Sequence, residues 1–202
     1  MKKLLLSDSI CKNVGTLPGV NHIVIRGGTI EDFKDLVFTG EVDIKGNDAV
    51  LLHVGTNNMA RAFDAQAVLT EIGSLIRLIK RVNAKILIVV SGILPRLVDL
   101  PNSDLPVKNY NKMLSRVCRD CGVMNIRSYN GFTSGKEARG IKEWLYCRDG
   151  LHLSHRGDVV LGQQFRVQFS DMNVIKRHAV IRREAESRED RDNCFGYKKA
   201  FL

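Results

Sequence analysis

The sequence predicts an α/β fold, a three-layer α/β/α sandwich in which helices cover both faces of a central parallel sheet of about five strands. Short runs rich in valine, isoleucine and leucine recur along the chain, and longer stretches with a helical spacing of apolar residues separate them. Continuous apolar strands that alternate with helices are typical of a parallel sheet buried on both faces. Because ligands bind beyond the carboxyl ends of the strands in such folds, the residues that follow each strand are the first candidates for function.

The candidate strands, in chain order, are LLL at 4–6, IVI at 23–25, AVLLHV at 49–54, KILIVV at 85–90 and the weaker VMNIRSY at 123–129. The clearest helix is expected over about 65–82, where apolar residues recur at intervals of three and four and form one buried face. A second helix is expected over about 108–121, with Gly122 as its C-terminal cap, and a third after Ser154 as its N-cap.

The composition is that of a globular protein with one core-forming domain. Of the 202 residues 44% are hydrophobic and 26% are charged, and no apolar run approaches the length that spans a bilayer. The opening MKKLLL has too few apolar residues for a signal peptide, so we expect an intracellular, cytoplasmic protein. The domain is expected over residues 1–175, followed by a charged, flexible tail over 176–202.

Net charge and cysteine content indicate the kinds of partner and the compartment. The formal charge of +9 favours attraction to polyanions, either RNA or DNA or an anionic membrane surface. The cysteines number 5 and are scattered, which favours a reducing compartment. Cys118 and Cys121 have the spacing of half a zinc site, but no second pair accompanies them and both fall in an expected helix. We therefore expect a structural role for this pair, with no metal and no cofactor.

Several loops at the expected edge of the sheet carry residues suited to acyl transfer. They hold Ser9 in SDSI, Gly28 in RGGTI, Asn57 in VGTNN, and Asp149 with His152 in DGLHLS. A serine hydroxyl becomes a nucleophile when an imidazole takes its proton, and the imidazole needs an acceptor at its other nitrogen. The amide of Asn57 and the backbone N–H groups of Ser9 and Gly28 can donate to the oxyanion that develops. The pattern predicts a serine nucleophile with its base, its orienting carboxylate and an oxyanion hole.

These segments, in this order, resemble the sequence blocks of the SGNH, or GDSL-type, hydrolases. The resemblance implies a flavodoxin-like fold and a metal-independent serine esterase. It assigns Ser9 as nucleophile, His152 as general base and Asp149 as its orienting partner, with Ser9, Gly28 and Asn57 forming the oxyanion hole.

The residues in and between these blocks indicate a narrower relationship. LLLSDSI, GGTIEDF, LLHVGTNNM, ILPR, NYNKML and DGLHLSHRG are similar to the esterase domain in the first-open-reading-frame protein of vertebrate LINE-type retrotransposons. This implies one module of a larger, RNA-associated protein. Two positions depart from the superfamily pattern: Ser7 stands where glycine is frequent, and Asn58 stands where aspartate is frequent, so the loop that holds Asn57 lacks a charge.

The expected substrate is an acetyl or lipid acyl ester. Apolar residues in segments 91–106 and 140–150 are expected near the same edge of the sheet, where they either line an acyl pocket or pack over the helices. An apolar rim beside basic residues favours lipid esters over sugars and is compatible with a membrane surface.

Alternative interpretations exist for most of these residues. Ser9 could be only the N-cap of a helix, His155 could be the base in place of its neighbour, and Cys147 could supply a thiol nucleophile. His155 lacks an aspartate three residues before it, and free cysteines are more often packed than reactive. Gly27 competes with Gly28 as the oxyanion donor. A catalytically silent module that binds nucleic acid or lipid is the alternative function, and the completeness of the site argues against it.

Overall fold

The computed structural model describes residues 1–134 and 140–173 and forms two compact units, Met1–Arg166 and Val167–Leu202. Residues 167–173 are the described part of the second unit, and they are helical. The expected tail over 176–202 lies outside the described residues. The sheet and the candidate site both belong to the first unit.

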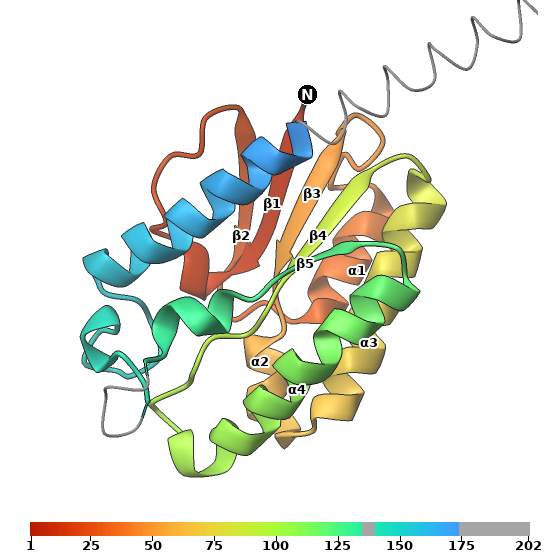
Figure 1. Cartoon of the computed structure of the whole chain (residues 1–202). Helices are drawn as coiled ribbons and strands as arrows, with labels where there is room; N and C mark the ends of the chain where they lie inside the picture. Colours follow the sequence, from red (N-terminus) through yellow and green to blue (C-terminus); the bar gives the residue numbers. More distant parts are fainter. Residues whose placement is uncertain (135–139, 174–202) are drawn as a thin grey trace, which may run out of the picture. The chain divides into compact units, whose positions relative to one another are not determined.

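A parallel sheet forms the centre of the first unit (Figure 1). In chain order its strands are β1 (Lys3–Asp8), β2 (Val20–Ile25), β3 (Ala49–His53), β4 (Leu87–Ser91) and β5 (Met124–Ile126). In space their order is β2-β1-β3-β4-β5, and every neighbouring pair runs parallel. This confirms the predicted sheet, because each strand overlaps one of the apolar runs. Asp8 pairs with Ile25 and Ser7 with His53, so β1, β2 and β3 end at the same edge.

Helices cover both faces of the sheet. They are α1 (Ile30–Thr39), α2 (Thr56–Ala62), α3 (Ala65–Val82) and α4 (Leu100–Asp120), with 3-10 helices at Ser9–Cys11, Ser128–Phe132 and Glu143–Leu145. α1, α3 and α4 lie on one face (Figure 1). On the other face residues 155–166 are helical, and the ring of Phe165 lies 5.7 Å from the ring of His53 on β3. None of the helices within the described residues is both long and apolar enough to cross a membrane.

The alternation of side chains along β1 explains why two helical layers are needed. Leu4 and Leu6 belong to the core beneath α1, α3 and α4, whereas Leu5 points to the opposite face, and all three are at most 1% exposed. α3 has the predicted bounds. Its N-cap, Asp64, accepts hydrogen bonds from two backbone N–H groups of the first turn, and its apolar stripe is buried.

The beginning of α4 differs from the prediction. The helix starts at Leu100, whereas the spacing of apolar residues predicted a start near residue 108. The first turns tolerate two prolines: Pro101 stands in the first turn, where its missing N–H costs nothing, and Pro106 lies inside the helix, where it removes one intrahelical hydrogen bond. The buried side chain of Ser103 also fixes this turn, because its hydroxyl donates to a backbone carbonyl of the preceding loop at 3.2 Å. The loop between β4 and α4 is correspondingly short.

Candidate active site

The predicted nucleophile lies at the point where β1 gives way to a 3-10 helix, Ser9–Cys11. Asp8 is the cap of this helix, since its Oδ1 accepts a hydrogen bond from the N–H of Ile10 at 3.0 Å. The interpretation of Ser9 as the N-cap is therefore wrong, and the hydroxyl of Ser9 faces His152 instead.

Asp8 is a carboxyl group buried directly behind the nucleophile. It is 0% exposed, and its Oδ2 has no hydrogen-bond partner among the described residues. Burial raises the pKa of Asp8 to about 7, and the hydrogen bond from Ile10 and the positive charge of Arg96 only partly oppose this effect. A charged Asp8 is thus costly to the folded state.

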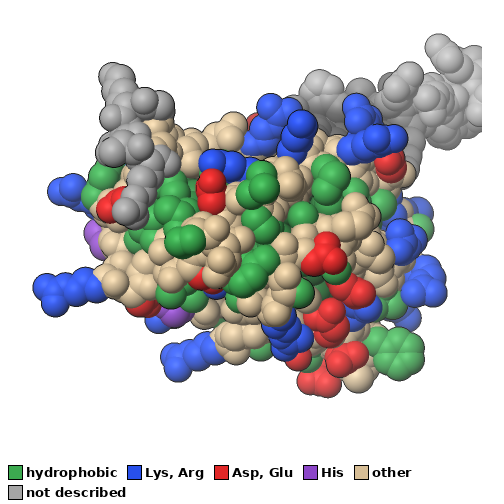
Figure 2. All heavy atoms as spheres, turned by 90° about the horizontal axis from the view of Figure 1, so that it is seen from below, with side chains coloured by type: hydrophobic (Ala, Val, Ile, Leu, Met, Phe, Trp, Pro, Cys, Tyr) green, Lys and Arg blue, Asp and Glu red, His purple; other side chains and the backbone are tan. Residues whose placement is uncertain are grey.

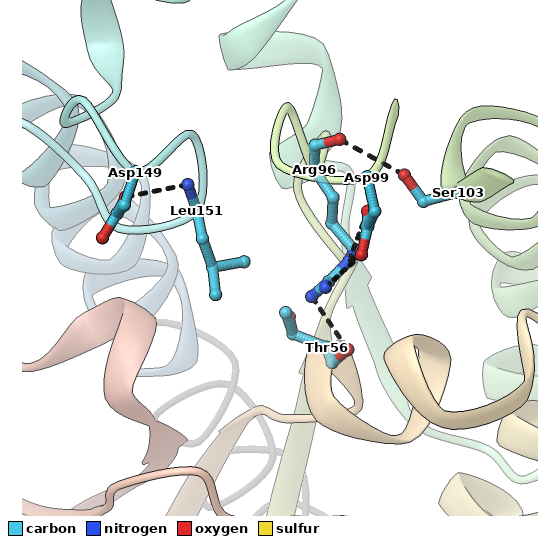
Figure 3. Close-up of polar contacts among 6 residues, drawn as sticks. All are labelled: Thr56, Arg96, Asp99, Ser103, Asp149 and Leu151. Atoms are coloured by element: carbon cyan, nitrogen blue, oxygen red, sulfur yellow. Dashed lines mark hydrogen bonds and ion pairs between the residues drawn. The ribbon is translucent and has the colours of Figure 1, made fainter. Parts of the chain in front are cut away.

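Ser9, His152 and Asp149 are connected by hydrogen bonds. Nε2 of His152 lies 3.2 Å from Oγ of Ser9, and Nδ1 of His152 lies 2.7 Å from Oδ2 of Asp149. The other carboxylate oxygen of Asp149 accepts from the N–H groups of Leu151 and His152, both at 2.9 Å, and Figure 3 shows the first of these bonds. The bond from Leu151 and the imidazole of His152 lower the pKa of Asp149 to about 2. The carboxylate is therefore ionised at neutral pH, as an orienting partner of a histidine base must be.

The structure also bears on the two alternative residues, His155 as the base and Cys147 as the nucleophile. His155 is exposed at the start of the last helix, one turn beyond the residue that reaches Ser9. The thiol of Cys147 donates to the backbone carbonyl of Leu153 at 3.1 Å and contacts neither Ser9 nor His152 through a hydrogen bond within the described residues. The predicted helix after Ser154 is present, and the hydroxyl of Ser154 caps it by accepting from the N–H of residue 157.

Two of the three predicted oxyanion donors, Asn57 and Gly28, lie side by side, and the N–H of Gly28 is engaged. Asn57 Nδ2 donates to the carbonyl of Gly28 at 2.8 Å and retains a second N–H for another acceptor. The N–H of Gly28 donates to the carbonyl of Ile25 at 3.1 Å, in a turn whose third residue, Gly27, has a φ of +67°. A Cβ at position 28 would lie 2.6 Å from Cβ of Ile25, so this turn requires glycine there as well.

Asn58, the residue after Asn57, links the start of α2 to α1 through two side-chain hydrogen bonds. Its Oδ1 accepts from the N–H of Ile30 at 2.9 Å, and its Nδ2 donates to Oε2 of Glu31 at 2.7 Å. α2 is thereby tied to the first turn of α1. The uncharged amide is used at both ends, and an aspartate at this position could not donate to Glu31.

Sequence reasoning missed one residue of this edge, Arg96. Its side chain is 5% exposed, its Nε and Nη2 donate to the carboxylate of Asp99, and its Nη1 donates to the carbonyl of Thr56 at 3.2 Å (Figure 3). The only sequence signal was an arginine placed three residues before an aspartate, directly after the apolar ILP. His53 behaves as a packed core residue: burial lowers its pKa to about 4, and its Nδ1 lies 2.7 Å from Oγ of Ser91.

The apolar rim is present only in part. Leu94 and Leu145 are buried in the core, whereas Val98 is 56% and Trp144 is 51% exposed. Figure 2 views the molecule from the side where the strands end, and hydrophobic side chains on that face are interspersed with basic and acidic ones. The two cysteines of the CxxC spacing are both free, and no group of three or more His, Cys, Asp or Glu in the described ranges is placed to hold a metal ion.

Comparison with known proteins places this arrangement in a family. Residues 9–159 match the model of the GDSL-like lipase/acylhydrolase family, a span that runs from Ser9 past His152. No curated protein sequence gave a match.

Solved structures share the fold at low sequence identity. A GDSL-like lipase from Bacteroides thetaiotaomicron is 17% identical, covers 84% of this chain and 88% of its own, and has a TM-score of 0.69. A lipase/acylhydrolase from Enterococcus faecalis is 21% identical, covers 83% of this chain and 95% of its own, and has a TM-score of 0.64. A carbohydrate esterase family 3 protein from Talaromyces cellulolyticus is 15% identical, covers 85% of this chain and 98% of its own, and has a TM-score of 0.63. With the family model spanning most of the chain, this protein belongs to the GDSL-like lipase/acylhydrolase family.

Proposed function

We propose that this chain is a metal-independent serine esterase that hydrolyses carboxylic esters through Ser9, His152 and Asp149. Membership of the family makes it an ester hydrolase. The observation that carries the assignment of residues is the continuous hydrogen-bond chain from Oγ of Ser9 through the imidazole of His152 to the carboxylate of Asp149.

In this mechanism Ser9 Oγ attacks the ester carbonyl while His152 Nε2 takes the hydroxyl proton. Asp149 accepts the hydrogen bond from Nδ1–H, which sets the tautomer and stabilises the imidazolium. The imidazolium then gives its proton to the leaving alkoxide, and the bond between the acyl carbon and the leaving oxygen breaks. Water, deprotonated by His152, attacks the acyl-enzyme and releases the carboxylic acid and free Ser9.

The tetrahedral intermediate carries a negative oxygen that needs donors. We propose the second N–H of the Asn57 amide, the backbone N–H of Ser9 and the backbone N–H of Gly28 for this role. The hydrogen bond from Gly28 to Ile25 would then have to be shared or broken when substrate binds, which keeps Gly27 as the competing donor.

We propose a short acyl group for the substrate. The side chain of His152 is 31% and that of Asp149 is 50% exposed, so the site is open. A cavity of about 710 Å³ in the first unit is lined by the α2–α3 connection, α3 and α4, and one of about 350 Å³ by α4 and the segments after β4 and around β5. Neither lining set includes Ser9 or His152. Neither of these two cavities therefore offers an enclosed volume beside Ser9 for a long acyl chain. The exposed Val98 and Trp144 instead support contact with an apolar leaving group.

The test is hydrolysis of p-nitrophenyl esters from acetate to longer acyl chains, in the presence of EDTA. Wild type should be active and Ser9→Ala inactive, while Ser74→Ala, which removes a hydroxyl from the middle of α3, should keep full activity. Activity should fall as the acyl chain lengthens. Equal activity of Ser9→Ala and wild type would falsify the mechanism, and folded but inactive wild type would move the assignment to a binding module.

We further infer that the chain is the esterase module of a retrotransposon-encoded protein. The sequence blocks LLLSDSI, ILPR, NYNKML and DGLHLSHRG support this, and the charge of +9 supports binding to RNA or DNA that weakens with salt. A reverse-transcriptase reading frame in the flanking genomic sequence is the expected finding. Flanks that encode no retrotransposon protein would contradict this inference.

A further inference from the structure

The segment between β4 and α4 lies between the two loops that carry the proposed catalytic groups. The side chain of Arg96, in this segment, binds one of these loops, because its Nη1 donates to the carbonyl of Thr56, the residue directly before Asn57. The guanidinium is fixed in turn by Asp99, whose two carboxylate oxygens accept from Nε and Nη2 (Figure 3). A planar guanidinium can make these three contacts at once because its donors form a rigid fork.

The backbone of the same segment binds the other loop. The N–H groups of Leu97 and Val98 both donate to the carbonyl of Gly150, at 2.8 and 3.1 Å. Gly150 follows Asp149 directly and precedes His152 by two residues. Its φ is +66°, and a Cβ at this position would lie 2.9 Å from the nitrogen of Val98, so only glycine allows this close approach.

One further hydrogen bond holds the segment from the side of α4, and the charge of Arg96 acts on a residue beside the nucleophile. Oγ of Ser103 in α4 donates to the carbonyl of Arg96 at 3.2 Å, and Ser103 is fully buried. The positive charge of Arg96 also acts on the carboxyl group of Asp8, the residue before the nucleophile. One buried guanidinium therefore interacts with the elements that carry Ser9 and Asn57, while its own backbone neighbours hold the loop of His152.

We propose that Arg96, held by Asp99, is a positioning residue that fixes the distance between the oxyanion donor Asn57 and the Ser9–His152–Asp149 system, an inference that rests on the proposed function. Arg96 is 5% exposed and forms no hydrogen bond with Ser9 or His152 in the described part of the chain. It acts on the reaction through Thr56 and the backbone, and substrate does not reach it. Loss of the fork displaces Asn57, and misplacing one oxyanion donor lowers kcat.

The first test compares kcat and KM for p-nitrophenyl acetate in wild type and Arg96→Lys. Lysine keeps the charge near Asp8 but cannot make the forked contacts. We expect kcat to fall about 10- to 100-fold, since complete loss of one oxyanion donor costs about 10²–10³, with KM changed less than about threefold. The matched control is Arg116→Lys, an exposed arginine of α4, which should leave both constants unchanged.

The second test asks whether Arg96 acts through Asn57. In a double-mutant cycle, Arg96→Lys should reduce kcat by less than about threefold when Asn57 is already alanine, because the donor it positions is gone. A full and additive loss in the Asn57→Ala background would overturn the proposal, as would a wild-type kcat for Arg96→Lys. A merely structural role would lower the thermal midpoint and leave kcat per folded molecule unchanged.

The controls separate this inference from the proposed function. Inactive Ser9→Ala together with fully active Arg96→Lys would overturn the positioning role alone, whereas fully active Ser9→Ala would overturn both. If Arg96→Lys does not fold, Asp99→Asn takes its place in the same cycle, because it weakens the clamp on the guanidinium while Arg96 can still bind Thr56. The same loss of kcat, abolished in the Asn57→Ala background, is the expected result.

Discussion

The carboxyl group of Asp8 makes the stability of this protein depend on pH. Burial raises its pKa from 3.8 to about 7 in the folded state, so between these values the folded chain binds a proton that the unfolded chain does not. Stability therefore falls as pH rises through this window. A shift of about three pH units at 1.36 kcal/mol per unit corresponds to about 4 kcal/mol, fully present below pH 4 and lost above pH 7.

Asp8→Asn tests this reasoning because the amide is neutral at every pH and its oxygen can still accept from Ile10. Urea denaturation at pH 4, 5.5, 7 and 8 should show the variant gaining on wild type as pH rises, by up to about 4 kcal/mol, and levelling off above pH 7. Asp120→Asn, which neutralises an exposed carboxylate of α4, controls for the change of charge. A free-energy difference between Asp8→Asn and wild type that stays constant from pH 4 to 8 would refute the argument.

Two further predictions concern the loops around the site. Asp149→Asn removes the carboxylate that holds the imidazole of His152, and kcat for p-nitrophenyl acetate should fall about 10²–10⁴-fold with the fold intact by circular dichroism; a change below threefold would contradict the role of Asp149. Asn58→Asp places a second carboxylate against Glu31 and removes a hydrogen-bond donor, so the free energy of unfolding at pH 8 should drop by about 1–3 kcal/mol. Urea denaturation measures this drop, and Asn58→Asp in a Glu31→Gln background should recover most of it.

The parts of the fold that were predicted correctly rest on local patterns of buried residues. The strands overlap short apolar runs and α3 carries an apolar residue at every third or fourth position, so both patterns are visible in the sequence itself. The start of α4 was predicted too late because the helix was placed from its apolar spacing, and its first two turns, LPNSDLP, hold few apolar residues that could reveal a buried face. The short helix α2 was not predicted at all, since its few buried residues form no periodic stripe.

The same distinction applies to the candidate site. Ser9 and Asn57 were predicted to lie together because parallel strands end at one edge, and that rule needs no knowledge of side-chain contacts. Arg96 was missed because its role depends on a backbone carbonyl 40 residues earlier in the chain and on Gly150, far later. The hydrogen bond that occupies the N–H of Gly28 was equally hidden, because it depends on the local shape of one turn.

Two unusual features of the described structure lie beside the proposed catalytic residues. Asp8 is a buried carboxyl with one unpartnered oxygen next to Ser9, and Gly55, with a φ of +109°, opens the helix that carries Asn57. A folded state keeps such features only where the surrounding packing imposes them, and here the leucine core of β1 and β3 lies immediately below. Substitutions that relieve these features, Asp8→Asn foremost, are therefore expected to raise stability at pH 8 and to lower kcat together. An Asp8→Asn variant that gained the full stability and kept the wild-type kcat would contradict this expectation. It would show that the buried carboxylate contributes nothing to the geometry of Ser9.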